Sequence, residues 1–438
     1  MPYPHYLVEE GTLIRRYTRL CDLAVASIFS LFALTGRNIF QVMLCSVALG
    51  AALIVEAYAQ LSGSVGPLLS ATHKADVKVC DITDYGATTD TDVAPYIQDA
   101  WTACATVGGL VYIPPGDWPM QTTVTLKDAT SIAIQWDGTI YRDSDTMTDQ
   151  MFTFSNNVDL EIFSGNSNGA IQGYGYEYLE NGDYGVRLMR FVSTSNFSLH
   201  GLSFVDSPSY YIVFDTVSSG EVYNLIIRGS TTLGETDGID VWGSNMWFHD
   251  IEVTNGDECV TVKSPSSNML IQSIYCNLSG GTAIGSLGLD TVVENIWYQH
   301  LYMNQADACF IKSNGGSGYV TSVSWRDVLV HGSSYPLTID LAWGNSDGGV
   351  GVNVSNLAWK NFFGYNTDAA RAVIRMECTA SAPCFELALS NVHMWTDDGD
   401  VAIYYCQDAY GSGACLVDET ESEDPADYTT TTKTTTTS

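Results

Sequence analysis

The chain has 438 residues, enough for one large domain or two ordinary ones. It is rich in glycine (39) and tyrosine (25) and poor in Lys and Arg (18 together), which is typical of an all-β secreted protein. The net charge of −32 argues against a nucleic-acid partner, because phosphate backbones are bound by patches of Lys and Arg.

Two apolar stretches open the chain, residues 22–35 and 43–55. Each is shorter than the ~20 residues that a helix needs to cross a bilayer. The second is followed by Ala57-Tyr58-Ala59, a small-x-small cleavage site. We therefore interpret residues 1–59 as a leader in which 43–59 is a secretory signal peptide. The mature protein is then expected to be extracellular and free of the membrane; a membrane anchor is the alternative.

A helix is predicted over residues 91–105. Ile97, Trp101 and Cys104 recur at helical spacing, and Pro95 stands near the start of the segment, where proline is tolerated. The strand and turn that follow this helix are expected to be the first of a long β-structure. The helix is therefore expected to cap its N-terminal end.

The middle of the chain repeats one pattern of apolar residues, h-x-h-x-x-h-x-h with h apolar. Each unit is interpreted as two short strands separated by a two-residue phase slip, which turns the chain while apolar side chains stay inward. A strand-only period of this length predicts a single-domain parallel β-solenoid over 60–418, with coils ~4.8 Å apart, and a β-propeller is the alternative. The third apolar position recurs every 23 to 34 residues, at Leu202, Leu225, Ile251, Ile274, Leu301, Val328 and Phe362.

Nine of the eleven cysteines follow the leader. In an oxidising compartment, close pairs suggest disulfide bridges, and Cys309 is left free. The cysteine-rich stretch 378–415 is expected to close the C-terminal end. The candidate pairs are Cys80–Cys104, Cys259–Cys276, Cys378–Cys384 and Cys406–Cys415.

Three sequons, at Asn196, Asn277 and Asn353, are candidate N-glycosylation sites. The acidic and then threonine-rich residues 419–438 cannot form a core and are expected to be a disordered tail. No Cys/His cluster has zinc spacing, and neither a metal nor another cofactor is expected.

Carboxylates recur at about the spacing of one coil. Asp257 stands twenty positions after Asp237, and Glu258 follows Asp257 directly. Stacked coils would bring them together, and like charges push their pKa values apart. One protonated and one ionised carboxyl group are what glycoside hydrolysis needs. Lys263 and Lys312 follow strands in the same column. The alternative is that these acids only shape turns.

These stretches resemble glycoside hydrolase family 28, the pectin-degrading polygalacturonases and rhamnogalacturonases. The polygalacturonase motifs Asn-Thr-Asp, Asp-Asp, Gly-His-Gly and Arg-Ile-Lys stand here as Glu235-Thr236-Asp237, Asp257-Glu258, Ser279-Gly280-Gly281 and Phe310-Ile311-Lys312. The Glu, the missing His and the missing Arg are similar to the rhamnogalacturonase branch, in which Asp-Glu-Cys-Val-Thr-Val-Lys-Ser is typical. The likeness covers roughly residues 60–415.

The resemblance implies a right-handed parallel β-helix of the pectin lyase-like kind. It also implies Asp257 as proton donor, Asp237 and Glu258 as the groups that position a water, and His331 on the same wall. The resemblance further implies that Lys312 binds a galacturonate carboxylate. Lys263 is expected either to do the same or to face solvent, and Asp240 to order the loop of Asp237.

The predicted function is endo-acting, inverting hydrolysis of the α-1,2 galacturonate–rhamnose linkages of rhamnogalacturonan I by a monomer. Inversion is implied by the resemblance, whereas a one-coil offset places carboxyl groups ~5 Å apart, the spacing generally associated with retention. The alternatives are a polygalacturonase or xylogalacturonan hydrolase, a polysaccharide lyase, and a non-catalytic carbohydrate-binding solenoid. A lyase needs calcium and a basic residue, and the missing Arg argues against it.

Overall fold

The computed structural model describes residues 61–179, 181–344, 348–368, 370–399, 401–418 and 431–433. The chain divides into two units between Ala59 and Gln60. The predicted leader and signal peptide lie outside the described residues, as does most of the predicted tail. Within that tail, β26 (Thr431–Lys433) pairs antiparallel with β24 (Ala402–Gln407).

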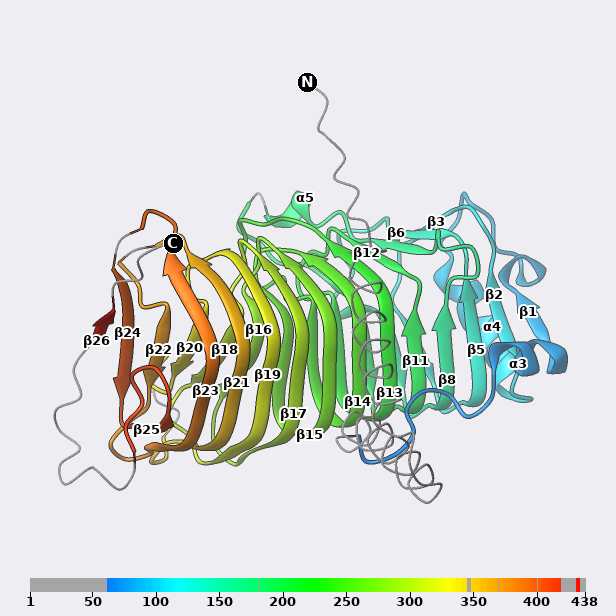
Figure 1. Ribbon diagram of the computed structural model, residues 1–438. Helices are drawn as coiled ribbons and strands as arrows, with labels where there is room; N and C mark the ends of the chain where they lie inside the picture. The colour runs from blue at the N-terminus through cyan, green and yellow to red at the C-terminus, as the bar shows by residue number, and fades with distance from the viewer. Residues whose placement is uncertain are drawn as a thin grey trace, which may run out of the picture. The chain divides into compact units, whose positions relative to one another are not determined.

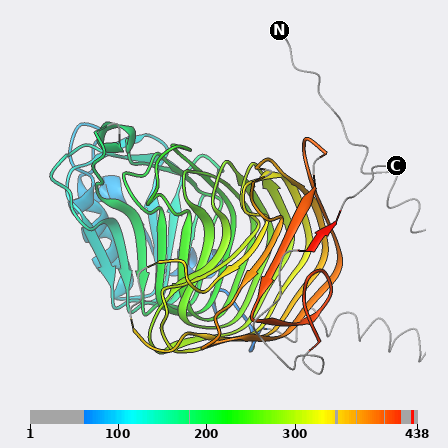
Figure 2. The same cartoon turned by 90° about the vertical axis from the view of Figure 1, so that its left-hand side faces the viewer.

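The described part of the chain is almost entirely β, and nearly all of its strand pairings are parallel (Figures 1 and 2). The strands that precede β26 are β1 (Val79–Asp81), β2 (Leu110–Ile113), β3 (Asp117–Met120), β4 (Val124–Lys127), β5 (Thr130–Trp136), β6 (Thr139–Arg142), β7 (Gln150–Ser155), β8 (Val158–Phe163), β9 (Ala170–Gln172), β10 (Arg187–Val192), β11 (Ser195–His200), β12 (Ser203–Val205), β13 (Ile212–Arg228), β14 (Ile239–Thr254), β15 (Glu258–Asn277), β16 (Gly281–Leu287), β17 (Thr291–Asn304), β18 (Cys309–Ser313), β19 (Gly318–Ser333), β20 (Leu337–Asp340), β21 (Asn353–Asn366), β22 (Ile374–Glu377), β23 (Cys384–Thr396), β24, and β25 (Ala409–Ser412).

The strand register confirms the predicted repeat and the parallel β-solenoid. Leu225 pairs with Ile251, and Ile251 with Ile274. The same column continues through Leu301, Val328 and Phe362, each one coil further on. Its members are buried, so one apolar ladder runs along the inside of the stacked coils.

The predicted phase slip has a backbone cause. The residue before each buried ladder position is left-handed, with φ of 50–56° at Asn224, Asp250, Ser273, His300, Asp327 and Asn361. One left-handed residue reorients the strand without ending it. Asn and Asp tolerate this conformation better than other non-glycine residues, which explains their frequency there.

The predicted N-terminal helix is present as α4 (Ala94–Ala105), with a proline in its first turn. Ile97, Trp101 and Cys104 are buried, so its apolar face covers the first coils. The expectation that the first strand follows this helix is wrong, because β1 (Val79–Asp81) precedes it and pairs with β2. The remaining helical segments are α3 (Ala71–Val77), η1 (Ile82–Tyr85) and α5 (Tyr176–Leu179).

All four predicted disulfides are present, Cys80–Cys104, Cys259–Cys276, Cys378–Cys384 and Cys406–Cys415. Cys309 is free and buried, as predicted, and Trp359 Nε1 donates to its Sγ at 3.2 Å. The cysteine-rich C-terminal stretch supplies the last coils, since β23 pairs with β21 and β24 with β22.

The three sequons differ in accessibility. Asn353 is exposed at the start of β21, whereas Asn196 and Asn277 are half-buried. Asn277 also accepts a hydrogen bond from Asn304. Glycosylation stays a prediction at all three, and Asn353 is the most accessible. None of the helices in the described ranges has the length and apolar character to cross a membrane.

Candidate active site

Three carboxyl groups meet where two successive coils turn into β14 and β15. Asp237 lies just before β14, and Asp257 and Glu258 lie at the start of β15. One oxygen of each carboxyl group lies within 4.8 Å of the others. Asp237 and Glu258 are buried and Asp257 is half-buried. The structure therefore brings together the three acids that sequence spacing placed on adjacent coils.

A buried amide holds the two acid-bearing turns together. Asn255 Nδ2 donates to the carbonyl of Thr236 at 2.7 Å and to that of Glu258 at 2.9 Å. The side chain of Asn255 is fully buried, so these bonds are not exchanged with water. A backbone bond from Gly238 to the carbonyl of Glu258 adds a third tie at 2.9 Å. Sequence analysis did not identify Asn255 as part of the site.

Asp257 is the acid best placed to be protonated. Burial and the neighbouring Glu258 raise the pKa of Asp257 to about 7. Two backbone amides, those of Glu235 and Glu258, donate to its carboxyl oxygens at 2.7 and 3.0 Å and oppose part of this rise. At mildly acidic pH, Asp257 therefore holds a proton that most aspartates have lost.

Glu258 has the opposite tendency. Burial raises the pKa of Glu258, but the hydrogen bond from Asp257 and the charge of Lys312 outweigh burial and hold it below its usual value. Lys312 Nζ forms an ion pair with Glu258 Oε1, from a strand two coils away. The adjacent carboxyl groups thus divide into one that keeps its proton and one that is ionised.

Asp237 and Asp240 are held by the second lysine. Lys263 Nζ lies 3.3 Å from Asp240 Oδ1 and 3.9 Å from Asp237 Oδ2. Burial raises the pKa of both aspartates, and the charge of Asp240 raises that of Asp237 further. Lys263 is therefore part of the acid cluster, with 28 % of its side chain exposed.

The same carboxylates are a set that could hold a metal ion. This set consists of Asp237, Asp257 and Glu258. Lysine ammonium groups already lie against Asp237 and Glu258, which supplies the opposite charge that a cation would bring.

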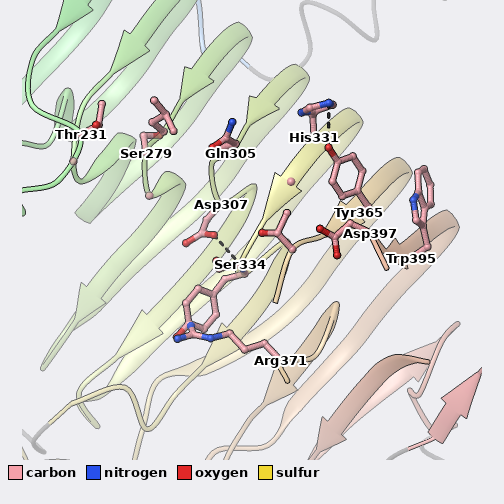
Figure 3. A pocket seen from close by; sticks show the side chains of 16 residues that line it. Thr231, Ser279, Gln305, Asp307, His331, Ser334, Tyr365, Arg371, Trp395 and Asp397 are labelled. Atoms are coloured by element: carbon pink, nitrogen blue, oxygen red, sulfur yellow. Dashed lines mark hydrogen bonds between the residues drawn. The ribbon is translucent and has the colours of Figure 1, made fainter. Parts of the chain in front are cut away.

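Figure 3 shows the lining of a cavity of about 960 Å³. The three acids do not line it, but Gly256, the residue before Asp257, does. Gly256 and Gly280 form its near edge, and the amide of Gly280 donates to the carbonyl of Asp257 at 2.8 Å. The next turn passes so close that a Cβ on Gly281 would lie 1.4 Å from the carbonyl oxygen of Asp307, and Gly281 has a φ of 71°. The glycines therefore let successive turns pack tightly beside the acids.

His331 lies in this cavity, one coil from Tyr365, whose hydroxyl is 3.1 Å from its Nε2. Figure 3 shows His331, Tyr365 and Trp395 following one another along the wall. The predicted role of His331 beside the acids stays a prediction, and its described polar partner is this tyrosine.

The cavity also contains groups that no sequence motif indicated. Asp307 accepts hydrogen bonds at 3.0 Å from Ser333 Oγ and at 2.9 Å from the amide of Tyr335, and burial raises its pKa to about 7. The guanidinium of Arg371 lies 3.9 Å from the ring centre of Tyr335. These residues come from three different coils, and only the stacking brings them together.

Known proteins resemble this chain over most of its length. The model of glycosyl hydrolases family 28 matches residues 111–415. A probable rhamnogalacturonase C of Aspergillus flavus is 55 % identical over 387 residues, which cover 88 % of this chain and 86 % of that protein. Rhamnogalacturonase A of Aspergillus aculeatus is 48 % identical over 378 residues, covering 85 % of this chain and 84 % of that protein.

Solved structures show the same fold at lower identity. The endo-xylogalacturonan hydrolase of Aspergillus tubingensis superposes with a TM-score of 0.67 at 22 % identity, covering 77 % of this chain and 96 % of that one. The polygalacturonase of Erwinia carotovora ssp. carotovora gives 0.65 at 18 % identity, covering 81 % and 100 %.

Proposed function

The chain belongs to glycosyl hydrolase family 28 and is a pectin-degrading glycoside hydrolase, and we propose that it acts on rhamnogalacturonan I. The proposed reaction is endo-hydrolysis of the α-1,2 linkage between galacturonate and rhamnose. The relatives of about half identity are named rhamnogalacturonases, and this chain covers most of their length. The observation that carries the chemistry is that Asp257 and Glu258 lie in one carboxyl cluster in which Lys312 is ion-paired with Glu258. This arrangement raises the pKa of Asp257 and lowers that of Glu258.

In this mechanism Asp257 is the general acid. It protonates the glycosidic oxygen as the bond to the anomeric carbon breaks, so that the rhamnose unit leaves as a neutral alcohol. Its raised pKa keeps the proton available at the mildly acidic pH that such a reaction uses. Its partial exposure distinguishes it from Asp237 and Glu258, which are buried.

Glu258 is the ionised group that orients and deprotonates the attacking water, with Asp237 as its neighbour on the preceding coil. The family resemblance implies that both acids position the water. The pKa of Glu258 is lowered and that of Asp237 is raised, which favours Glu258 as the base and Asp237 as a hydrogen-bonding partner of the water.

We propose inversion of configuration, as the family resemblance implies. One oxygen from each of the three acids lies within 4.8 Å of the other two, which is closer than the separation usually found in inverting enzymes. The compact cluster therefore favours retention by the general rule, and the stereochemistry of the product decides between the two.

The two lysines are proposed to bind substrate carboxylates as well as to hold the acids. Lys312 lies on β18 with 13 % of its side chain exposed, and Lys263 is more accessible. His331 is proposed as a polar contact to the sugar in the cavity. No cofactor is proposed, and the enzyme is proposed to be a secreted monomer whose partner is the pectic polysaccharide.

A substrate panel tests the proposed function. The purified enzyme is incubated with saponified rhamnogalacturonan I, polygalacturonate and xylogalacturonan, and products are separated by anion-exchange chromatography. We expect oligosaccharides of several lengths from rhamnogalacturonan at early times, and little release from the other two. Preferred cleavage of polygalacturonate or xylogalacturonan would assign the enzyme to those activities instead. An unsaturated product absorbing in the ultraviolet would indicate a lyase. If no polymer yields a product, the protein would be assigned as a non-catalytic carbohydrate-binding solenoid.

A further inference from the structure

We propose that Arg371 is the carboxylate receptor of the cavity beside the acid cluster, and that it binds the galacturonate unit held there. The inference rests on the proposed function, which makes the substrate an alternating polymer of an acidic and a neutral sugar. It adds a specificity-determining residue that comes from a turn between β21 and β22, far in sequence from the catalytic acids.

The lining of the cavity is chemically selective. Among its described lining residues, Arg371 is the single Arg or Lys. The remainder include three aromatic side chains, those of Tyr335, Tyr365 and Trp395, together with His331, two acids and small polar groups. The two acids are Asp307 and Asp397. Aromatic faces and a guanidinium suit a sugar acid, because the rings pack against its C–H groups while the guanidinium binds its carboxylate through two parallel hydrogen bonds.

The guanidinium is held in place before any ligand binds. It lies 3.9 Å from the ring centre of Tyr335, and its Nε donates to Asp368 Oδ2 at 2.9 Å. Tyr335 in turn stacks on Phe310, with ring centres 5.9 Å apart. Ring stacking and one ion pair fix the plane of the guanidinium, so less conformational entropy is lost when an anion binds.

The fork of Arg371 has hydrogen-bonding capacity left. Nη1 is buried and has no hydrogen-bond partner among the described residues. A buried donor of a charged group is seldom left without an acceptor, because the loss of water is then uncompensated. The Arg371 side chain as a whole is 39 % exposed, so a carboxylate entering the cavity can reach the guanidinium, and a small shift of the side chain would bring Nη1 to the same acceptor.

The acids around Arg371 do not remove this capacity. Asp368 engages Nε, and Asp397 is an exposed residue at the rim. Asp307 lies deeper in the cavity and is bonded to Ser333 and to the amide of Tyr335. The raised pKa of Asp307 keeps its carboxyl group neutral in acidic solution, so Asp307 then does not compete with a substrate carboxylate for the charge of Arg371.

The test uses binding to the full-length protein in an Asp257→Asn background, so that little turnover occurs. Rhamnogalacturonan oligosaccharides are titrated by calorimetry in their natural form and after reduction of their carboxyl groups to alcohols, and chromatography after each titration checks that the residual activity of Asp257→Asn has not cleaved them. We expect Arg371→Gln to weaken binding of the acidic ligand by roughly 10- to 100-fold, the worth of a charged bidentate contact, and to leave binding of the reduced ligand unchanged. Arg371→Lys, which keeps the charge but not the fork, should fall between.

Arg326→Gln is the matched control. Arg326 is also stacked on an aromatic ring, 4.8 Å from the centre of Trp297, but it does not line the cavity. It should bind both ligands like the parent. Melting temperatures of all variants establish that they are folded. An Arg371→Gln variant that binds acidic and reduced ligands with the same change, or with no change, overturns the inference.

Failure of the inference and failure of the proposed function have different signatures. If rhamnogalacturonan is not cleaved but oligogalacturonate binds through Arg371, the substrate assignment fails and the carboxylate receptor stands. If rhamnogalacturonan is cleaved and Arg371→Gln affects both ligands equally, the reverse holds.

Discussion

Lys312 and Glu258 form an ion pair although they are 54 positions apart in the chain. They lie on β18 and β15, two coils from one another, and both side chains are largely withdrawn from solvent. The lysine therefore acts on the catalytic cluster directly, by keeping one of its carboxyl groups ionised beside another that is protonated.

Replacing Lys312 with Met should raise the pKa of Glu258, because the opposite charge that lowers it is removed while burial remains. We expect kcat/KM to fall roughly 10- to 100-fold, with the acidic limb of its pH profile moved to higher pH. Lys312→Arg should restore part of the activity. An acidic limb that does not move in Lys312→Met would show that Lys312 acts only on the substrate.

The protonated state of Asp257 predicts the alkaline limb. Activity should decline as pH rises through about 7, where Asp257 loses its proton, instead of rising to a plateau there. Asp257→Asn should lower kcat by about 10³-fold below pH ~7, where Asp257 holds its proton, while oligosaccharide binding and the melting temperature are retained. Near-normal turnover in this variant would exclude Asp257 as the acid.

Asn255 should matter for stability and for the alignment of the acids. Asn255→Ala removes both side-chain bonds between the turns and leaves the carbonyl of Thr236 without its described donor, whereas the carbonyl of Glu258 keeps the amide of Gly238. We expect the variant to lower the free energy of unfolding by about 2–3 kcal/mol in urea titrations. Asn304→Ala, an exposed site whose amide bonds Asn277, is the control and should change stability by less than about 0.5 kcal/mol. Equal effects would mean that the buried amide is replaced by water.

Asp307 should make stability depend on pH in a defined direction. Its pKa is about 7 in the folded protein, above that of an unfolded aspartate, so the folded state binds the proton more tightly and stability falls as pH rises from ~4 to ~7. Asp307→Asn cannot ionise, so it should raise the free energy of unfolding at neutral pH, by at most about 4 kcal/mol, and change it little at pH ~4. Asp257 titrates over the same range, so a smaller slope should remain. Thermal scans across pH compare the two proteins, and parallel curves would refute the effect.

The stereochemistry of hydrolysis is read from the first product. Proton NMR during cleavage of an α-linked substrate should show the β-anomer of the new galacturonate reducing end before mutarotation. Initial release of the α-anomer would establish retention, the outcome that the close spacing of the acids favours by the general rule.

Much of the fold could be predicted because apolar residues recur at the same position of each coil. Leu225, Ile251 and Ile274 stand in one column of the sequence pattern and in one column of the structure. Since coils stack in register, a carboxylate one period after another had to lie beside it. Asp237, Asp257 and Glu258 were predictable for that reason.

The cavity could not be predicted in the same way. Tyr335 and Arg371 lie in turns whose lengths break the period, so no fixed spacing relates them to the acids. Asn255 was missed for another reason, because an asparagine next to a glycine is an ordinary turn signal and its buried bonds depend on the neighbouring coil. The ion pairs of the two lysines likewise needed side-chain positions.

The inward-facing ladder and the turns between strands are subject to different constraints in this molecule, because the left-handed residue before each ladder position keeps the ladder side chains facing inward. The inward-facing side chains of one coil must pack against those of the next coil along the whole ladder. A turn that projects from a coil needs to fit only the turns directly beside it. Lineages can therefore exchange or lengthen a single turn, and so acquire a different sugar preference, without redesigning the scaffold that keeps the proton-transferring acids in line.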